Sequence, residues 1–538
     1  MKRKQWFIGG CIGVTLLGVG FGLQPLSDAY IGPYVQEKLH TALNGTVSYS
    51  SFHIDWDGSI QVQDIAVDDA QGDRVLTADR MTISIQWLRV LQYPFGHVSP
   101  DALIGTITIT TPHLNLVQNT EGQWNVLGLL KEQGSEEPSQ FSGLIRIDEG
   151  ILSLVVPHKS ALVMTNIDAT LRGDGGQSLE TVLDGTLGAD TIHSVVTIGM
   201  GENRDQSFYV QTDHLTMDPI LERLDVPDLL KTTKGSLKDV ALTMSKRGGF
   251  WYGEGQVTLD DVSVPIPDYT ITSGKGQVQI HGDVVFLQDI QADVKGEHLR
   301  VDGTLHHVFD EDPTLQLGVH LTEWNLASIL ASDVGGYVSA DAMLTGPMSN
   351  VRGNADVRVR DVTYDGVTVD RGKAHLAYGD GMIHVSDLDV AVQGGKVEGT
   401  GDYDLEKGTY AGNLTLQGLS LYGLPMSGAL HLGGSISGSV SVEGNSNGIL
   451  RMSGQVQGDR IRYESFNFDA VTASIIWDGS RVTIPYLNGN LGSGSITGHG
   501  YVENNQFAVD LYGTKLELHD LIHESQPAVE GTISLQLH

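Results

Sequence analysis

The sequence is poor in cysteine and in basic residues, and each shortage excludes a kind of site. Cys11 is the single cysteine among 538 residues, so a disulfide within the chain is impossible and a thiolate metal site lacks ligands. Lysine and arginine together number 33, against 66 aspartates and glutamates, which gives a formal net charge of −33. Because contacts to nucleic-acid phosphates need Lys and Arg, we expect no nucleic-acid partner.

Recognisable metal-binding and catalytic motifs are also scarce. The sequence contains no EF-hand loop, Walker A motif or metalloprotease helix motif. We therefore interpret the acidity as a solvated acidic surface, with divalent cations held between aspartates as the alternative. His306 and His307 beside the acidic residues 310–312 could suggest a metal, but Pro313 and the acidic run indicate a surface turn. We predict no metal site and no cofactor.

Residues 444–448 match the G-x-S-x-G motif of a serine nucleophile. A nucleophile elbow needs a helix after the serine, whereas residues 449–454 have the pattern of a strand. Asn and Gly on both sides of Ser446 are typical of a hairpin turn. We therefore predict a hairpin here, no catalytic residues and no enzyme.

Glycine, in contrast, is abundant. The 67 glycines are spread between short runs in which apolar and polar residues alternate, which indicates turns between many strands. The predicted fold class is mainly β: an N-terminal transmembrane helix followed by an elongated, repetitive antiparallel sheet. Such a sheet can curve into a trough with an apolar inner face, in a taco-like or solenoid-like form.

The N-terminus predicts a membrane anchor. Lys2, Arg3 and Lys4 precede residues 6–23, which carry no charge. This length lies between that of a signal-peptide core and that of a membrane span, and we favour an uncleaved anchor over a cleaved signal. The positive charges place residues 1–5 in the cytoplasm and the rest of the chain beyond the membrane. Residues 24–45 are predicted as a helix that begins near Pro33.

The remainder divides into β regions and repeats. Residues 46–130 and 142–234 are predicted as β regions, and the charged, apolar-poor residues 131–141 as the linker between them. Gly235, Gly336, Gly434 and Gly531 each begin an alternating strand, and a leucine-rich segment precedes each one. They define repeats of roughly 100 residues. The predicted boundaries are 235–335, 336–433 and 434–530, with 531–538 as the start of a truncated fourth repeat.

The alternating strands offer one apolar face, which has two interpretations. Two such faces can bury each other in a sandwich, or one sheet can bend into a trough whose lining binds acyl chains. Acyl chains need apolar contact and no exact polar site. The predicted lining residues are Ile107, Ile109, Leu114, Leu116, Val278, Ile280, Ile383, Val385, Leu388, Val390, Val482, Ile484 and Leu487.

Residues 103–130 carry a family resemblance. A strand of alternating isoleucines, a proline, a two-leucine strand, a glycine turn and a Trp-Asn pair follow one another. The positions are Ile107, Ile109, Pro112, Leu114, Leu116, Gly122, Trp124 and Asn125. This order resembles the N-terminal part of AsmA-like proteins, envelope proteins of bacteria with two membranes, and within that family the TamB proteins. Residues 76–85 resemble the strand that precedes this segment in the family.

The resemblance implies a function. It implies an inner-membrane protein with a single span and most of its chain in the periplasm. Its role would be outer-membrane biogenesis, either by moving phospholipids between membranes in a groove or by assisting outer-membrane protein assembly. Membrane phospholipids are the expected ligands. An outer-membrane assembly protein would be reached through a C-terminal part that we expect to be missing from this chain.

Two other classes of protein compete with this interpretation. A secreted surface β-solenoid of the adhesin type would have repeats of about 20–30 residues and a cleaved signal. A polysaccharide-acting β-helix enzyme would have acids and aromatics clustered over successive rungs, a pattern we do not find in the sequence.

Overall fold

A computed structural model gives the structure of the chain in the following ranges, and all structural statements concern them: 44–55, 59–86, 104–129, 143–174, 178–199, 205–224, 232–266, 269–330, 334–364, 366–422, 432–445, 448–463, 466–503, 506–517 and 531–537. The predicted tail and anchor, nearly all of the predicted helix 24–45 and the linker 131–141 lie outside these ranges. Within the ranges, no helix is both long enough and apolar enough to span a membrane.

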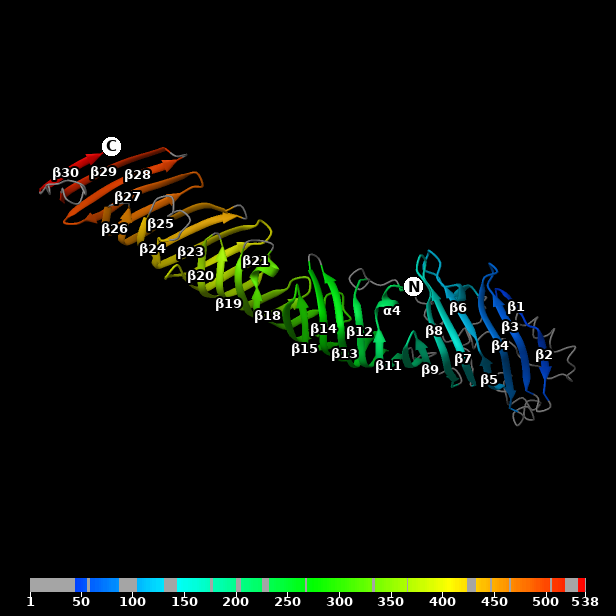
Figure 1. Cartoon of the computed structure of the whole chain (residues 1–538). Coiled ribbons are helices and arrows are strands. Elements are labelled where there is room, and N and C mark those ends of the chain that lie inside the picture. The colour runs from blue at the N-terminus through cyan, green and yellow to red at the C-terminus, as the bar shows by residue number, and fades with distance from the viewer. Residues whose placement is uncertain are drawn as a thin grey trace. The chain divides into compact units, whose positions relative to one another are not determined.

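The described residues are mainly β-strand, which confirms the predicted fold class at that level. They form thirty strands, coloured along the chain in Figure 1. The chain divides into two compact units, the first ending at Ile290 and the second beginning at Gln291. Each unit is described separately.

The first unit contains fourteen complete strands among the described residues and two short helical turns. The elements are β1 (Thr46–Ser48), β2 (Ser51–Ile54), β3 (Ile60–Asp68), β4 (Arg74–Ile85), β5 (Ile104–Thr110), β6 (His113–Val117), η3 (Asn125–Gly128), β7 (Leu144–Val155), β8 (Leu162–Gly173), β9 (Ser178–Leu187), β10 (Asp190–Gly199), β11 (Gln206–Thr216), α4 (Asp218–Leu221), β12 (Lys234–Arg247), β13 (Phe250–Ile266) and β14 (Tyr269–Gly282). Strand β15 (Val284–Val294) spans the boundary between the units.

Pro112 interrupts the alternating pattern of residues 103–130. It separates β5 from β6, and both strands pair in parallel with the same partner, β7. Thr111 has a φ of 47° and Glu149, opposite it on β7, has a φ of 57°. Both chains therefore leave the extended conformation at the same level, and the pairing register with β7 is the same before and after the proline.

A closed hydrophobic core lies at the beginning of the first unit. Strands β3 to β7 supply most of its side chains. Val126 of η3 and Leu129, which directly follows η3, add to it and are 5% and 6% exposed. A chain segment that leaves the sheet thus returns over its apolar face and covers it. From β7 to β14 each strand pairs antiparallel with the next.

The second unit is an antiparallel meander in which each strand from β16 to β30 pairs with its sequence neighbours. The elements are β16 (Glu297–His306), β17 (Thr314–Asn325), α6 (Leu326–Ile329), β18 (Gly335–Pro347), β19 (Arg352–Tyr364), β20 (Val367–Gly379), β21 (Met382–Val392), β22 (Gly395–Asp404), β23 (Thr409–Ser420), β24 (Leu432–Asn445), β25 (Gly448–Tyr463), β26 (Phe466–Trp477), β27 (Arg481–Leu491), β28 (Gly494–Glu503), β29 (Gln506–Glu517) and β30 (Thr532–Leu537).

The glycines that mark the sequence repeats share one backbone geometry. Gly336 and Gly434 have φ angles of 106° and 105°. Strand β24 is the sixth strand after β18, and β30 is the sixth strand after β24. A Cβ on Gly336 would lie 2.6 Å from the Cα of Val362, and one on Gly434 would lie 2.5 Å from the carbonyl oxygen of Arg460. Each glycine thus lets its strand approach the backbone of the following strand closely. The domain boundaries drawn from these glycines remain a prediction.

Irregularities recur in the meander and bend its strands. The register shifts by one residue between Leu321 and Trp324, between Val385 and Leu388, and between Gly513 and Leu516. The residues inside these β-bulges, Glu323, Asp387 and Lys515, have φ angles of 51°, 51° and 55°. A bulge bends its strand and increases the local twist, so a series of bulges curves the sheet.

A candidate acyl-chain-binding face

Cross-strand register places the apolar side chains of the second unit on one face, which we call the apolar face. Directly paired residues of neighbouring strands point to the same side of a sheet. One row of paired residues crosses twelve strands from β17 to β28, and each member is apolar or glycine. The row is Val319, Ala342, Ala355, Leu376, Val385, Gly401, Gly412, Val442, Met452, Trp477, Val482 and Val502.

Nine of the predicted lining residues lie in register positions that agree with such a face. In β21, Ile383, Val385, Leu388 and Val390 pair with Tyr403, Gly401, Gly399 and Val397 of β22. In β27, Val482, Ile484 and Leu487 pair with Val502, Gly500 and Gly498 of β28. In the first unit, Val278 and Ile280 of β14 pair with Val257 and Gly255 of β13. All nine side chains are half-buried. Their contact with a ligand remains a prediction.

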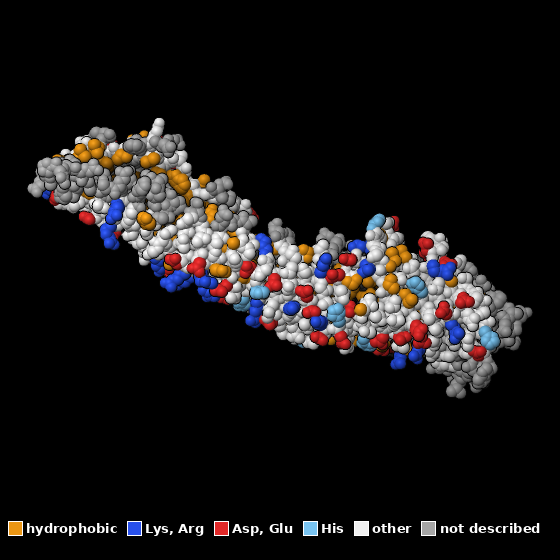
Figure 2. Space-filling model, viewed as in Figure 1, with side chains coloured by type: hydrophobic (Ala, Val, Ile, Leu, Met, Phe, Trp, Pro, Cys, Tyr) orange, Lys and Arg blue, Asp and Glu red, His pale blue; other side chains and the backbone are white. Residues whose placement is uncertain are grey.

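The exposure of the side chains shows that the apolar face is sheltered. Along β23, exposed and half-buried residues alternate from Thr409 to Leu416, and every half-buried residue is on the apolar face. The same alternation runs through most of β19. Figure 2 shows hydrophobic side chains gathered on one side of the region of β23 to β29 and charged side chains on the other. The apolar face is therefore the less exposed of the two faces in these strands.

Glycines on the apolar face lie opposite large side chains and leave room for them. Gly399 lies between Leu388 and Leu414 in adjacent strands, and Gly498 lies between Leu487 and Leu511. A Cβ on Gly399 would lie 2.4 Å from a backbone oxygen and 2.8 Å from Cδ2 of Leu414. The sequence pattern contains these glycines, but spacing alone does not show that they face leucines.

The four predicted lining residues of the N-terminal region prove to be core residues instead. Ile107, Ile109 and Leu116 are 0%, 3% and 5% exposed, and Leu114 packs against the same cluster. Val126 and Leu129 of the η3 segment cover them. The prediction that these four residues line a groove is therefore wrong in this structure, because the segment after the glycine turn closes the apolar face.

The polar face of β16 to β22 is strongly charged. Asp341 accepts a hydrogen bond from Arg358 Nη2 at 2.6 Å and contacts His320 Nδ1 at 3.0 Å. His320 and Arg358 together hold the pKa of the Asp341 carboxyl below its ordinary value. Similar pairs join His375 to Asp356 and Lys396 to Glu398. The partners in each pair contact each other and are exposed to solvent. Such pairs add little to the free energy of unfolding.

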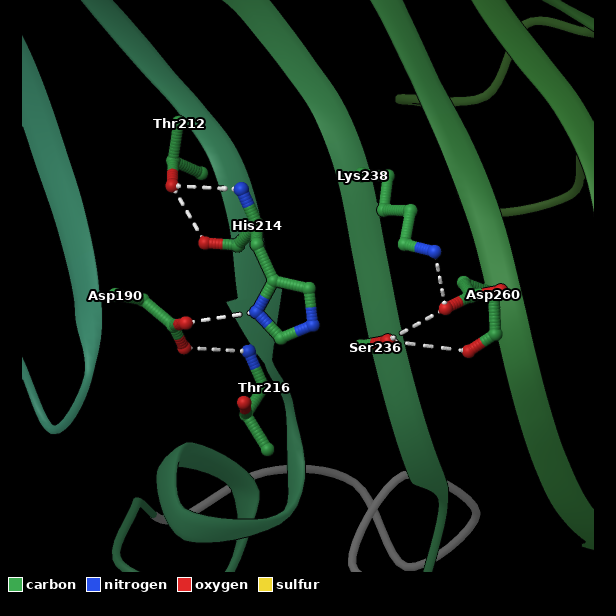
Figure 3. Close-up of polar contacts among 7 residues, drawn as sticks. All are labelled: Asp190, Thr212, His214, Thr216, Ser236, Lys238 and Asp260. Atoms are coloured by element: carbon green, nitrogen blue, oxygen red, sulfur yellow. Dashed lines mark hydrogen bonds and ion pairs between the residues drawn. The ribbon is translucent and has the colours of Figure 1, made fainter.

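A second polar cluster lies in the first unit (Figure 3). The Asp190 carboxylate contacts His214 Nδ1 at 2.7 Å and accepts the Thr216 backbone N–H at 2.8 Å. Burial alone raises the pKa of Asp190, but the bonds from Thr216 and His214 outweigh burial and lower that pKa. Beside it, Lys238 Nζ lies 2.8 Å from Asp260, and this contact is the main cause of the lowered pKa of Asp260.

This cluster borders a depression of about 340 Å³ between β9, β10 and β11. Its histidines are already paired, since His193 Nδ1 also lies 2.7 Å from Asp184. The described ranges hold no group of three or more His, Cys, Asp or Glu side chains placed to bind a metal. The cluster therefore holds the ends of neighbouring strands together. It contains no nucleophilic side chain that is hydrogen-bonded to a general base.

The two sequence motifs that might carry chemistry are turns, as predicted. Asn445, the last residue of β24, pairs with Gly448, the first of β25, so the G-x-S-x-G motif spans a hairpin. His306 ends β16, and the backbone N–H of Asp310 donates to the His307 carbonyl in the turn before β17.

Comparison with known families links the repeats to one of them. The family model of the TamB C-terminal domain matches residues 288–491. No curated protein and no solved structure matches the chain. The match confirms the resemblance to TamB and AsmA-like proteins, a group of envelope proteins of outer-membrane biogenesis and lipid transport. It falls on a C-terminal domain model, so it gives no support to the expectation that the far-end part of TamB is missing here.

Proposed function

We propose that the chain is an inner-membrane-anchored periplasmic protein that holds phospholipid acyl chains on its apolar face. In this role it moves phospholipids between membranes or assists outer-membrane protein assembly. The observation that carries the proposal is the apolar row from Val319 to Val502, which crosses twelve strands without a polar side chain. The family match over residues 288–491 supports it, because the matched segment covers most of that row.

The physical chemistry of acyl binding suits such a face. Each buried CH₂ contributes about 0.8 kcal/mol, so an acyl segment of about ten methylenes contributes on the order of 8 kcal/mol when fully covered and about half that with one side in water. The attraction is non-directional. A row without polar anchors therefore binds a chain at many positions and lets it slide between strands.

The surface β-solenoid alternative is not favoured by the geometry. That alternative predicts repeats of about 20–30 residues, whereas the strand pattern recurs only after six antiparallel strands. The anchor at residues 6–23 and the outer-membrane partner belong to the proposal through the sequence and the family resemblance.

The test uses pairs of adjacent substitutions on opposite faces. Val385→Asp and Ile484→Asp place a carboxylate on the apolar face, where its desolvation is costly. Ser386→Asp and Thr483→Asp are matched controls, because their residues pair with His375 and Tyr501 on the polar face. Lipids that co-purify with the full chain in mild detergent are measured by mass spectrometry, and β content by circular dichroism.

We expect the two apolar-face variants to lose bound lipid and keep their β content, while both controls retain lipid. Equal lipid in all four variants would show that the apolar face does not hold acyl chains. Unfolding of the apolar-face variants alone would identify Val385 and Ile484 as ordinary core residues and remove the support for an open face.

A further inference from the structure

The polar face of β23 to β27 differs from that of β16 to β22, because its centre carries hydroxyl, amide and phenol groups in place of charges. Over β28 and β29 the centre of the polar face is instead occupied by His499 and Asp510, whose Nε2 and Oδ2 atoms lie 3.1 Å apart. Three adjacent rows of directly paired residues cross the polar face. The first is Thr415, Ser439, Gln455, Ser474 and Tyr486. The second is Asn413, Ser441, Ser453, Ile476, Thr483 and Tyr501. The third is Ser437, Gln457, Thr472, Asn488, Thr497 and Tyr512. We call these seventeen residues the neutral patch.

The patch contains a depression and a run of tyrosines. A hollow of about 480 Å³ lies over β23 to β26 and is bordered by Ser439, Ser453, Gln455 and Ser474. Each of the three rows contains a tyrosine, on β27, β28 and β29. Tyr486 and Tyr512 are 50% and 41% exposed. The five-strand first row spans about 19 Å, from a strand spacing of ~4.8 Å.

The polar groups around the hollow are available to a ligand. In the part of the chain that the structure describes, the side chains of Ser439, Ser453, Gln455 and Ser474 have no hydrogen-bond partner within the protein. Ser441, which donates to Asn413 at 2.6 Å, shows that neighbouring groups do pair where they can. Hydroxyls and amides both donate and accept, so the hollow offers both kinds of partner at short intervals.

The chemistry of the patch selects one class of ligand. Its members include no Lys or Arg, and the Arg481 guanidinium at its border lies over the Tyr501 ring, 3.7 Å from the centroid, so the patch offers few of the contacts that polyanions need. Its members include no carboxylate, the ligand that hard cations prefer, and Asp510 between its rows is paired with His499. Ile476 is its single aliphatic side chain, so an apolar helix finds little surface. Pyranose rings present hydroxyls at their rims and C–H groups on their faces. They match amide and hydroxyl rows that carry the exposed rings of Tyr486 and Tyr512, whose faces are apolar and whose tips are polar.

We infer that the neutral patch is a binding site for a linear, uncharged polysaccharide chain. The chain lies across the strands, its hydroxyls bonded to Ser439, Gln455 and Ser474, and one ring stacks on Tyr486. This inference concerns the polar face and does not depend on lipid binding to the apolar face.

The test is titration of the full chain in detergent with chitohexaose, cellohexaose and maltohexaose, with heparin as a polyanion, by isothermal calorimetry. We expect at least one neutral hexasaccharide to bind and heparin not to bind. Tyr486→Ala should weaken that binding about tenfold, the scale of one aromatic stacking contact. Tyr486→Trp, which keeps a ring, should retain it.

Tyr337→Ala is the matched control, because Tyr337 is a tyrosine of similar exposure that pairs with Arg360 in the charged region. It should leave hexasaccharide binding unchanged, and neither tyrosine variant should alter co-purified lipid. Failure of all three hexasaccharides to bind, equal binding by Tyr486→Ala and the unsubstituted chain, or equal binding of heparin would overturn the assignment. A change of oligomeric state in Tyr486→Ala, measured by light scattering without any sugar binding, would instead identify the patch as a contact between copies of the chain.

Discussion

Substitution of Gly336 by alanine tests whether the repeat-marking glycines are required by backbone geometry. At a φ of 106° an L-residue is strained, and the added Cβ would lie 2.6 Å from the Cα of Val362 and 2.7 Å from the carbonyl oxygen of Asp361. Both obstacles are backbone atoms, so no side chain can rotate away to relieve the contact. Strand β18 must shift from β19 if the methyl group is to fit.

The expected cost has two parts. The strained backbone contributes about 1–3 kcal/mol and the overpacking another 1–3 kcal/mol, so the total is about 2–6 kcal/mol. Gly408→Ala is the control, because Gly408 has a φ of 63° and no atom within 4 Å of its ideal Cβ position. It should cost only about 1–2 kcal/mol, the price of a left-handed L-residue.

Hydrogen exchange measured by mass spectrometry is the suitable assay, because a long array need not unfold in one cooperative step. Gly336→Ala should accelerate exchange in β18 and β19, and Gly408→Ala should affect only the ends of β22 and β23. Equal protection of β18 in the two variants would refute the argument that close backbone approach requires glycine at position 336.

Three other predictions follow from the strands, the acidic cluster and the N-terminus. Asp387→Val should lower stability by about 1–2 kcal/mol, because a β-branched residue tolerates the left-handed backbone of the bulge poorly. Asp387→Gly should be neutral or slightly stabilising. Urea-induced unfolding measures the stability of both variants. The lowered pKa of Asp190 means that its stabilising effect is fully present above the ordinary carboxyl value of 3.8 and is lost as pH falls through the lower native value. Asp190→Asn should therefore lower the melting temperature at neutral pH by an amount that shrinks in strong acid. If residues 6–23 are a retained anchor, N-terminal sequencing of the membrane fraction should find Met1 or Lys2, and a soluble form that starts near residue 28 would contradict the anchor.

The sequence predicted much of the repeated architecture, since its physical signals are local. Alternation at Ile383, Val385, Val482 and Ile484 identified both the strands and the side of each strand that is apolar. Pro112 marked a break that the structure contains. The two faces of each strand lie in different environments, so apolar and polar residues alternate along the strand. This alternation is visible in the sequence.

The errors and omissions have equally physical causes. Alternation at Ile107 and Ile109 looks the same whether the apolar face is open or covered, and only the tertiary position of Val126 and Leu129 decides between them. The bulges were missed although they leave a signal: Val385 and Leu388 are three residues apart, not two, with an aspartate at the break. The acidity of the chain thus includes carboxylates such as Asp387 that adopt left-handed backbone, besides a solvated surface.

The neutral patch could not be derived from one strand at a time. Ser439, Gln455 and Ser474 each occupy an ordinary polar position in an alternating strand, and only the cross-strand register brings them into one row. Their lack of internal partners becomes visible only with side chains in place.

The meander of the second unit has a consequence for how the protein can form and change in length. Because β16 to β30 pair only with sequence neighbours, no strand must wait for a distant segment before it finds its partner. A chain that becomes available gradually from its N-terminal end can add strands one at a time to a growing edge. Gain or loss of a whole six-strand segment between Gly336 and Gly434 leaves the pairing at every other position intact. Such a gain or loss would change the length of the sheet by whole six-strand segments, while the strand pairing and side-chain pattern of each remaining segment stay the same.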